Sequence, residues 1–516
     1  MKKMKKALAL ALAGVMMASA LTGCKKQETA GGDTGDLELT LHMHFFGYCV
    51  YDDNWPVFKE AAKKTGVTLK GTAVETVSDS AQAYSTMLAD KKLPDIIHYV
   101  GTDLLKSGMD GALIPLEDLI DQYAPHIKAF FEKCPEARVA ATAADGHIYY
   151  IPGTLAPIGS GNVPSEAFFI RQDWLDKLGL KAPATVDEYY EALKAFKTQD
   201  PNGNGQADEI PYFDRAGTIN DLYQLFAAHA DYYINDQGQY VNGRTEDAYK
   251  NAVKELAKWY REGLIDPEIF TRGQQAREQL LSSNIGGATH DWISSTTSYN
   301  DKYPEVAGLN FTPIAPPADK DGVVKEALGR SLLHGLGWGI SKDNKHIERT
   351  MEYFDFWFTD EGSILSSYGI EGEDYTVENG EYKFTDTVLK ADGGVPNYLR
   401  NIGAAVEIGS ERQLGSELAG MNDMGKKAFE EYQKNNWVQA QMPTLSYTQE
   451  QQDVLTTNKP NLDTYCKEQE QKWIMGAEDV DANWDQYLAT LKTMGNEEIL
   501  KVYNEAYQSY ETALKK

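Results

Sequence analysis

Oxygen-bearing side chains alternate with small residues in one short acidic segment, residues 200–209. Its spacing matches positions 1, 3, 5, 7 and 9 of a calcium-binding loop, with Gly205 at position 6 for the sharp turn. Position 12 is Pro211 instead of glutamate, so Glu209 at position 10 must supply the missing carboxylate. A solvated Asn/Gly turn is the alternative interpretation. We predict a structural Ca²⁺ site whose ligands are Asp200, Asn202, Asn204, Gln206, Asp208 and Glu209.

Other patterns that could carry chemistry are weaker. His42 and His44 lie one residue apart on a predicted strand, but no carboxylate or cysteine cluster accompanies them, so metal transport is disfavoured. Cys49, Cys134 and Cys466 show no metal-type spacing, and we expect buried thiols, with one disulfide still possible. The sequence has no phosphate loop, no Gly-x-Ser-x-Gly and no His-Glu-x-x-His motif, so an enzyme is disfavoured.

The N-terminus has the pattern of an export signal. Four lysines precede an apolar run over residues 7–21, which is too short for a typical membrane span. The run ends in Leu21-Thr22-Gly23-Cys24, which resembles the bacterial lipobox. That resemblance implies cleavage before Cys24 and a diacylglycerol on its thiol, whereas an ordinary signal peptide with a chance cysteine is the alternative. Residues 25–36 are polar and glycine-rich, so we expect a flexible tether.

Charge and hydropathy limit the partners of the remaining chain. The formal net charge is −27 at pH 7, so bulk attraction to nucleic acid is excluded, because phosphate binding needs clustered lysine and arginine. No segment after the N-terminal run is long and apolar enough to span a bilayer. We therefore expect a solvated extracellular protein that reaches the membrane only through its lipid.

The first elements after the tether predict a parallel sheet. Alternating or apolar runs predict strands over residues 37–45, 67–74 and 94–100, and helical patterns over 55–65 and 80–89 separate them. Strands and helices that alternate in this way form an α/β sheet with right-handed crossovers. Ligands bind beyond the carboxyl ends of such strands, so the loops there are the first candidates for a site.

Five short segments that are spread along the mature chain have characteristic residue patterns, and one of them is part of the acidic loop. They are Asp-Gly-Ala-Leu-Ile-Pro-Leu at 110–116, Ala-Asp-Gly-His-Ile-Tyr at 144–149, Ile-Arg-Gln-Asp-Trp-Leu at 170–175, Asp-Pro-Asn-Gly-Asn-Gly at 200–205 and Phe-Thr-Asp-Glu-Gly at 358–362. In this order they resemble the extracellular solute-binding lipoproteins of ABC importers, most closely the large carbohydrate-binding subgroup of Gram-positive bacteria. Such proteins carry a calcium loop like the one at 200–209.

The resemblance implies an α/β, two-lobed, periplasmic-binding-protein-like (type II) fold with a ligand cleft between the lobes. By this analogy residues 1–23 are the signal peptide, 24–36 the tether and 37–157 the first part of lobe one. Residues 158–308 form the first part of lobe two, 309–373 return to lobe one, and 374–516 complete lobe two with C-terminal helices. The proline-containing segment 311–317 would be one hinge crossing.

Sugar recognition combines aromatic rings, which cover C–H faces, with polar side chains that hydrogen-bond hydroxyl groups. We expect such residues in the cleft-facing loops of both lobes. The candidates are Tyr48, Tyr51, Asp52, Trp55, Ser78, Asp79, His98, Tyr99, Asp291, Trp292, His334, Trp338, Tyr368, Glu371, Asn397, Tyr398 and Arg400. For most single rings, core packing is the competing role.

The combined prediction is a monomeric receptor, anchored by lipid to the outer face of the bacterial cell membrane. It would capture an oligosaccharide, close around it and deliver it to the permease subunits of an ABC transporter. Two alternatives remain: a lipid-anchored glycoside hydrolase with paired carboxylates, and a solute-binding protein for peptides.

Overall fold

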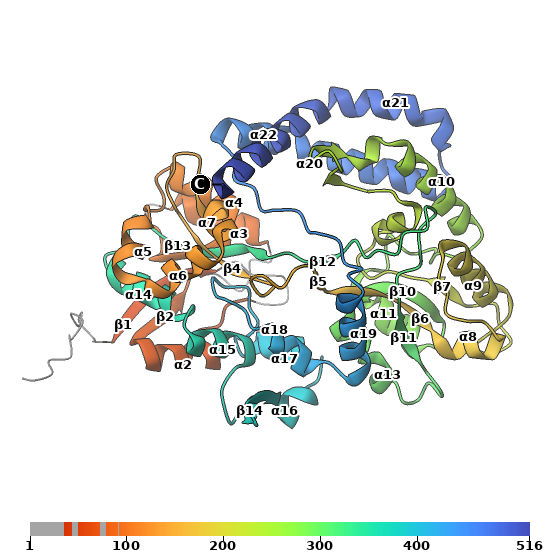
Figure 1. Cartoon of the computed structure of the whole chain (residues 1–516), viewed down its shortest axis with the longest axis horizontal. Coiled ribbons are helices and arrows are strands. Elements are labelled where there is room, and N and C mark those ends of the chain that lie inside the picture. Colours follow the sequence, from red (N-terminus) through yellow and green to blue (C-terminus); the bar gives the residue numbers. More distant parts are fainter. Residues whose placement is uncertain (1–35, 44–49, 73–78, 91, 516) are drawn as a thin grey trace, which may run out of the picture. The chain divides into compact units, whose positions relative to one another are not determined.

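A computed structural model describes residues 36–43, 50–72, 79–90 and 92–515 (Figure 1). The expected signal peptide, the lipidation site Cys24 and most of the tether lie outside the described residues, as do His44, Tyr48, Cys49 and Ser78. Two separate sheets, one of five strands and one of four, organise the described part of the chain. Among the described residues, no helix has the length and apolar character needed to cross a bilayer.

The five-stranded sheet has the order β2-β1-β3-β13-β4. Strands β1 and β3 are parallel, with Leu41 opposite Ile96, as the sequence predicted for its first strands. Strand β13 returns from far along the chain and pairs antiparallel with both β3 and β4. The bounds are β1 (Leu37–Met43), β2 (Val67–Gly71), β3 (Ile96–Val100), β4 (Ile151–Thr154) and β13 (Leu333–Ile340).

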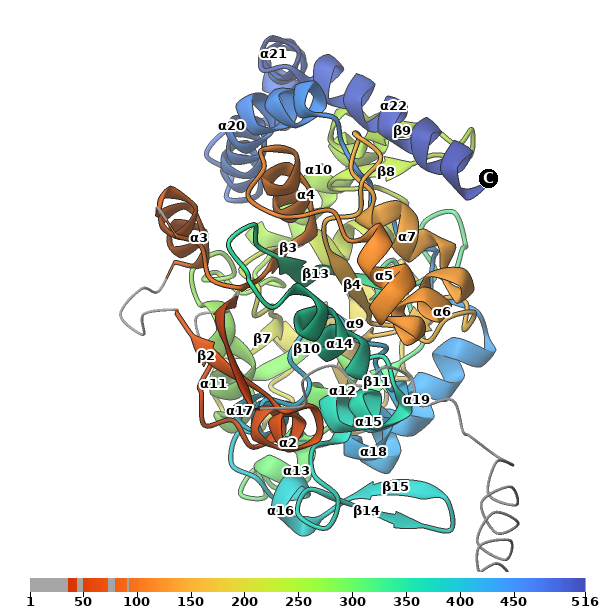
Figure 2. The same cartoon turned by 90° about the vertical axis from the view of Figure 1, so that its left-hand side faces the viewer.

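Helices from two distant stretches of the chain pack around this sheet. Helix α14 contacts α5, α6 and β13, and these helices lie together in Figure 2. Gly66 follows the last residue of helix α2, and its φ of 70° places it in the left-handed region that is common at a helix C-cap. The bounds are α2 (Pro56–Thr65), α3 (Ser80–Ala89), α4 (Gly101–Met109), α5 (Glu117–Tyr123), α6 (Pro125–Lys133), α7 (Pro135–Ala141), α14 (Ile347–Phe356) and α15 (Asp360–Tyr368).

The four-stranded sheet has the order β11-β6-β10-β7. Strand β10 pairs parallel with β7 and antiparallel with β6, which also pairs antiparallel with β11. The hinge crossing expected at 311–317 is wrong in its first half, because Phe311 to Ile314 pair with β6 inside this sheet. The bounds are β6 (Glu166–Arg171), β7 (Ile210–Tyr212), β10 (Gly286–Trp292) and β11 (Phe311–Ile314).

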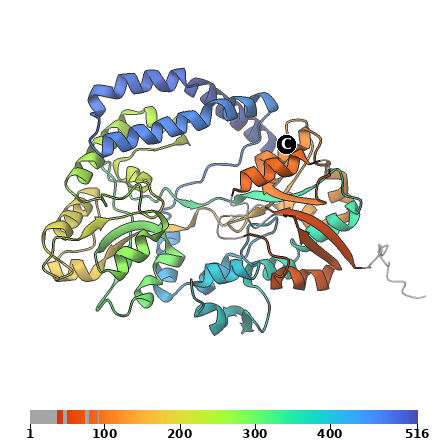
Figure 3. The ribbon, with the colours of Figure 1, turned by 180° about the vertical axis from the view of Figure 1, so that it is seen from behind.

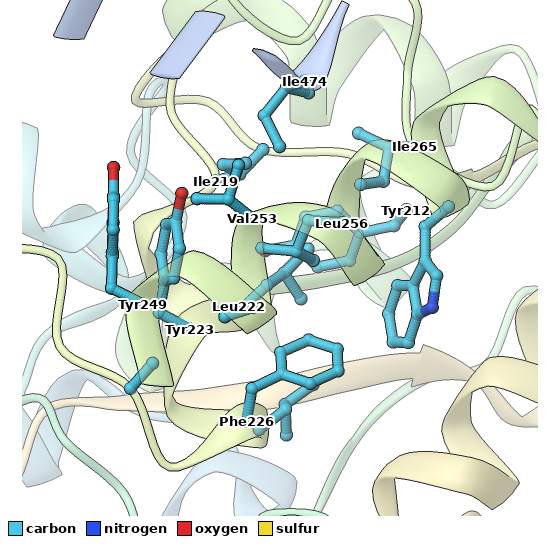
Figure 4. Packing of buried hydrophobic residues seen from close by; sticks show 14 of the residues in the cluster. Tyr212, Ile219, Leu222, Tyr223, Phe226, Tyr249, Val253, Leu256, Ile265 and Ile474 are labelled. Carbon is cyan, nitrogen blue, oxygen red and sulfur yellow. The ribbon is translucent and has the colours of Figure 1, made fainter. Parts of the chain in front are cut away.

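A large apolar core joins this sheet to the helices around it. Tyr223, Val253 and Leu256 pack in it beside Ile474 of the C-terminal region (Figure 4). Figure 3 shows the long C-terminal helices in blue, of which α20 contacts both α10 and α22. The bounds are α8 (Gln172–Leu178), α9 (Val186–Thr198), η1 (Asn220–Phe226), η2 (Gly243–Thr245), α10 (Asp247–Arg261), η3 (Gly273–Gln275), α11 (Ala276–Ser282), α12 (Ile293–Thr296), α13 (Tyr299–Lys302), α20 (Gln449–Ile474), α21 (Val480–Thr493) and α22 (Asn496–Leu514).

Short strand pairs and helices complete the described chain. The chain leaves β4 through β5 and returns toward β13 through β12, and these two segments pair antiparallel. This pair, rather than 311–317, accompanies the passage of the chain between the two sheets. The bounds are β5 (Val163–Pro164), β12 (Gly329–Arg330), β8 (Tyr232–Ile234), β9 (Tyr240–Asn242), β14 (Tyr375–Glu378), β15 (Glu381–Phe384), α16 (Asp386–Leu389), α17 (Val395–Asn401), α18 (Leu414–Gly420) and α19 (Asp423–Lys434).

Candidate functional site

The acidic loop at 200–209 connects α9 to β7 and forms one tight turn. The Asp200 carboxylate accepts hydrogen bonds from the backbone N–H groups of Asn204 and Gly205 at 3.1 and 3.0 Å. The Asp208 carboxylate accepts the side-chain amides of Asn202 and Asn204 at 3.0–3.2 Å. Gly205 has a φ of 77°, so the turn uses the glycine that the loop pattern requires at this position. The predicted oxygen donors are therefore held close together.

Glu209 carries the strongest sign that this loop holds a cation. The residue is 1% exposed, and among the described residues neither carboxylate oxygen has a hydrogen-bond partner of good geometry. Burial raises the pKa of Glu209, and the nearby carboxylates of Asp208 and Asp200 raise it further. A buried carboxylate without a partner is costly, and a bound divalent cation would remove that cost. The donors of this loop are oxygen atoms, which fits the preference of Ca²⁺.

A second candidate site lies at the carboxyl end of β10. Asp291 is 3% exposed. Its carboxylate accepts a hydrogen bond from Nε of Arg215 at 2.8 Å and another from Nη1 of Arg277 at 2.7 Å. Trp292, the next residue, is 36% exposed, so part of its indole ring is open to a ligand. The Arg330 guanidinium lies 5.4 Å from the centre of that ring, within range of a cation–π contact.

The arginines near Asp291 and Trp292 are already paired with carboxylates. Arg330 forms an ion pair with Glu417, while Arg215 and Arg277 share Asp291. Burial lowers the pKa of Arg215, but the attraction of Asp291 outweighs it and the net shift is upward. This end of β10 therefore combines the Trp292 ring with arginine N–H groups whose orientation is fixed by ion pairs, and the ion pairs balance the positive charge of the arginines.

His290, the residue before Asp291, is fully buried among carboxylates. Burial alone would lower its pKa, but the attraction of Glu326 and Asp221 raises it well above the usual value. Burial also raises the pKa of Glu326, and His290 partly opposes that shift. The sequence analysis did not identify this cluster, because its members come from separate segments of the chain.

The predicted residues at the end of the five-stranded sheet are buried and have structural partners, and their role in ligand binding stays a prediction. His98, His334 and Trp338 are each at most 4% exposed. Each ring donates a hydrogen bond to a backbone carbonyl of segment 407–409. His98 Nε2 donates to the Glu407 carbonyl at 2.9 Å, and His334 Nε2 donates to the Ile408 carbonyl at 2.8 Å. Trp338 Nε1 donates to the Gly409 carbonyl at 3.1 Å. Because carbonyl oxygens only accept, both histidines carry the proton on Nε2.

The predicted residues near β1, β2 and α3 also have structural partners. Trp55 is buried and packs against Tyr51 and Phe58, which gives it a structural role, and its contact with a ligand stays a prediction. Tyr51 donates its hydroxyl to the Leu69 carbonyl at 3.3 Å. Asp79 caps α3. The exposed Asp52 carboxylate accepts the N–H of Asn54, and Tyr99 stacks on Tyr84 with ring centres 3.8 Å apart.

The last group of predicted residues was expected in loops and is partly helical. Tyr368 is a buried residue of α15 that stacks on Tyr382, and its role in ligand binding stays a prediction. Asn397, Tyr398 and Arg400 belong to α17 instead of a loop. The Tyr398 hydroxyl donates to Asp374 at 2.8 Å, the exposed Asn397 amide donates to Gly393, and Glu371 is exposed.

A cavity of about 320 Å³ contains residues that the sequence analysis missed. It lies against α20 and combines aromatic rings, an ion pair and a hydroxyl group, the mixture that polar ligands require. Only Thr102 follows a predicted strand end, and the other lining residues lie far along the chain. The lining is Thr102, Tyr447, Gln452, Leu455, Thr456, Lys459, Pro460, Asp463 and Tyr503.

Comparison with known proteins decides what kind of protein carries these sites. The family model for "Bacterial extracellular solute-binding protein" matches residues 54–364. The chain belongs to this family. The two-lobed α/β fold predicted from the sequence is therefore confirmed, and with it the prediction of a solute-binding component. Members of the family are binding proteins that act outside the cytoplasm.

Three similar proteins span nearly the whole chain. The fructooligosaccharide ABC transporter substrate-binding protein FusA of Streptococcus pneumoniae serotype 4 is 28% identical over 488 residues, 88% of this chain and 87% of FusA. Lipoprotein LipO of Bacillus subtilis is 24% identical and covers 98% of both chains. The crystal structure of the alginate-binding protein AlgQ2 without calcium ion is 36% identical, with a TM-score of 0.82, and covers 92% of this chain and 99% of its own.

Proposed function

We propose that this solute-binding protein captures an oligosaccharide outside the cell for import by an ABC permease. The observation that carries the proposal is the partly exposed Trp292 ring at the end of β10, with the Arg330 guanidinium 5.4 Å from its centre. An aromatic face beside directed N–H groups suits the alternating C–H and hydroxyl surfaces of a sugar. The names of FusA and AlgQ2 support the same ligand class.

The charges around Trp292 favour a neutral oligosaccharide over an acidic one. Each arginine near the ring already has a carboxylate partner, and His290, two residues before Trp292, is surrounded by three carboxylates. An added uronate would therefore have to compete with the carboxylates that already pair with Arg215, Arg277 and Arg330. We propose a neutral chain, such as a fructooligosaccharide, in preference to alginate fragments.

Calorimetry with purified protein tests this function. Fructooligosaccharides should bind with a Kd in the micromolar range, which corresponds to about −8 kcal/mol, and alginate oligosaccharides should bind at least about tenfold more weakly. Slow release of shorter sugars from the mixture would instead support the hydrolase. Binding of short peptides without binding of any sugar would support the peptide receptor.

We further propose that the loop at 200–209 binds a structural Ca²⁺ ion. Asp200, Asn202, Asn204 and Asp208 would supply side-chain oxygens, Gln206 its backbone carbonyl, and Glu209 the carboxylate that lacks a partner. The ion would neutralise the buried Glu209 and fix the turn between α9 and β7.

Calcium removal provides the test of this loop. A chelator should lower the Tm by several degrees, and added calcium should restore it. The variant Asp208→Asn should lose most of this calcium-dependent shift. The matched control, Asp187→Asn, changes an acid in the first turn of α9 outside the loop and should respond to calcium like the wild type. A Tm that calcium does not change would contradict the proposal.

Lipid anchoring is proposed from Cys24 and supported by the similarity to a protein named as a lipoprotein. The variant Cys24→Ala should release the receptor from the membrane fraction into the medium. Retention of this variant on the membrane would contradict the anchor. We propose a monomer that meets its permease at the outer face of the cell membrane, and sedimentation of the soluble form should give a mass near that of one chain.

A further inference from the structure

His290 and three carboxylates from four separate segments meet at one end of the four-stranded sheet. His290 lies on β10 and Glu166 begins the neighbouring strand β6. Asp221 lies in the short helix η1, and Glu326 lies on the segment that leads to β12. None of these side chains belongs to the calcium loop or forms the ion pairs around Trp292.

Glu326 fixes the orientation of the imidazole ring. Its Oε2 lies 2.9 Å from His290 Nε2, and its Oε1 accepts the backbone N–H of Leu328 at 2.9 Å. Both side chains are fully buried. Because a carboxylate accepts the Nε2 proton, it directs the lone pair of a neutral ring to Nδ1. Histidines that bind metals are held by a carboxylate in this way.

The other nitrogen of the ring faces two carboxylates at a distance typical of metal ligands. Nδ1 lies 3.3 Å from Glu166 Oε2 and 3.3 Å from Asp221 Oδ2, and among the described residues it makes no hydrogen bond of good geometry. The three ligand atoms all lie within 4.8 Å of one another. A tetrahedral Zn²⁺ ion with bonds of about 2.0–2.1 Å separates its ligands by about 3.3–3.4 Å. Two of the three spacings therefore match ligands of one ion.

We propose that Glu166, Asp221 and His290 bind one divalent transition-metal ion, with Zn²⁺ as the preferred ion. A nitrogen donor with two carboxylates favours Zn²⁺ over Ca²⁺ or Mg²⁺, which prefer oxygen ligands. Glu326 positions His290 without touching the ion. The ion would take the place of a proton on Nδ1 and offset part of the negative charge that four segments bring together here.

The fourth coordination position would be open to a solvent molecule. The side chains of Glu166 and Asp221 are 16% and 15% exposed, so the carboxylate side of the cluster reaches solvent while the His290 side is closed. His290 and Trp292 project from the same face of β10, because side chains alternate along a strand. The ion would therefore lie on the side of the sheet that also presents the Trp292 ring.

The test uses the full soluble chain, stripped with a chelator and supplied with excess CaCl₂ so that the acidic loop is filled. Titration with ZnCl₂ should show one equivalent of tight binding, and CoCl₂ should give the visible absorption of four-coordinate Co²⁺ at the same stoichiometry. Glu166→Gln and Asp221→Asn should weaken Zn²⁺ binding by about 100-fold, and Glu326→Gln by about 10–100-fold.

Two control variants separate this site from other metal contacts. His147→Gln removes an exposed histidine that pairs with Glu117, and Asp208→Asn alters the calcium loop. Both should bind Zn²⁺ like the wild type. Glu166→Gln and Asp221→Asn change partly exposed groups, so they keep the test valid if a variant of the buried His290 does not fold. Circular dichroism confirms folding for each variant.

Three results would overturn the proposal. The first is the absence of stoichiometric Zn²⁺ and Co²⁺ binding to the folded wild type, which would leave a protonated His290 among its carboxylates. The second is binding that survives unchanged in both Glu166→Gln and Asp221→Asn. The third is binding that His147→Gln abolishes, which would place the ion at the surface pair. None of these results depends on the identity of the sugar, so the proposed transport function is tested separately.

Discussion

The ends of the two sheets carry similar residue types in opposite environments. At the end of the five-stranded sheet, His98, His334 and Trp338 are buried, and backbone carbonyls of 407–409 accept their N–H groups. At the end of the four-stranded sheet, the Trp292 ring is partly exposed, and charged side chains surround its neighbour Asp291. A tryptophan at a strand end is therefore not a ligand contact by type alone. Its burial and the partner of its N–H decide between a structural and a binding role.

Removal of Trp338 should give the largest effect, because it creates a cavity in the core. Trp338 is fully buried, stacks on Phe354 and donates to Gly409. Trp338→Ala should lower the free energy of unfolding by about 3–5 kcal/mol, measured by urea titration. Trp338→Phe keeps most of the apolar volume and should cost much less. If Trp338→Ala instead left stability unchanged and abolished sugar binding, the structural assignment would be wrong.

Asp291 tests whether the second sheet end depends on charge pairs. Asp291→Asn would leave Arg215 and Arg277 without their shared carboxylate in a partly buried site. We expect a loss of about 2–3 kcal/mol in the free energy of unfolding, below the value for a fully buried pair. The control, Asp52→Asn, removes an exposed carboxylate and should change stability by less than about 0.5 kcal/mol. Equal effects of both substitutions would contradict the proposed network.

Trp292 should show the opposite pattern to Trp338. Trp292→Ala removes a ring that is 36% exposed, so the free energy of unfolding should fall by about 1–2 kcal/mol, less than for the fully buried Trp338. Sugar affinity should fall by about 10–100-fold, or about 1.4–2.8 kcal/mol, if the ring stacks on the ligand. Calorimetry measures the affinity and urea titration the stability. An unchanged Kd would remove Trp292 from the binding site.

Local patterns predicted the elements but not the long-range partners. The spacing of apolar residues located β1 and β3, and Gly66 marked the end of α2, because these signals act within a few residues. The spacing of the loop at 200–209 is local as well, and Gly205 has the positive φ that the pattern predicts at its sharp turn. The burial of Trp338 depends on Gly409, where a Cβ atom would lie only 2.5 Å from the indole ring. Nothing near Trp338 in the sequence reveals that contact.

The hinge error and the missed histidine cluster have the same cause. Prolines near 313–317 suggested an extended crossing, but an edge strand tolerates proline, and β11 is the edge of its sheet. The cluster around His290 needs Glu166, Asp221 and Glu326 from three other segments, so no sequence motif contains it. The site is formed by contacts between segments that are distant in the sequence, and a single sequence does not reveal such contacts.

The smallest expected effect concerns the pH dependence of stability at the end of the five-stranded sheet. Burial lowers the pKa of His334 below its usual value of about 6.5. As the pH drops, the unfolded chain therefore takes up a proton on this histidine at a higher pH than the folded chain does. The contribution of neutral His334 to the free energy of unfolding is complete above about pH 6.5 and decreases below it. In His334→Gln, the free energy of unfolding should decrease less steeply between pH 6.5 and 5 than in the wild type.

The exposed His147 supplies a control of opposite sign. Its hydrogen bond to Glu117 raises its pKa, so its stabilisation is present at low pH and is lost as the pH rises through the folded-state value. His147→Gln should therefore make the decrease in stability toward low pH steeper, by a small amount because the pair is open to solvent. Urea titrations at half-unit pH steps measure both slopes. Changes of the same sign in the two variants would show that burial does not govern His334, and the contrast between the two sheet ends would lose its support from titration.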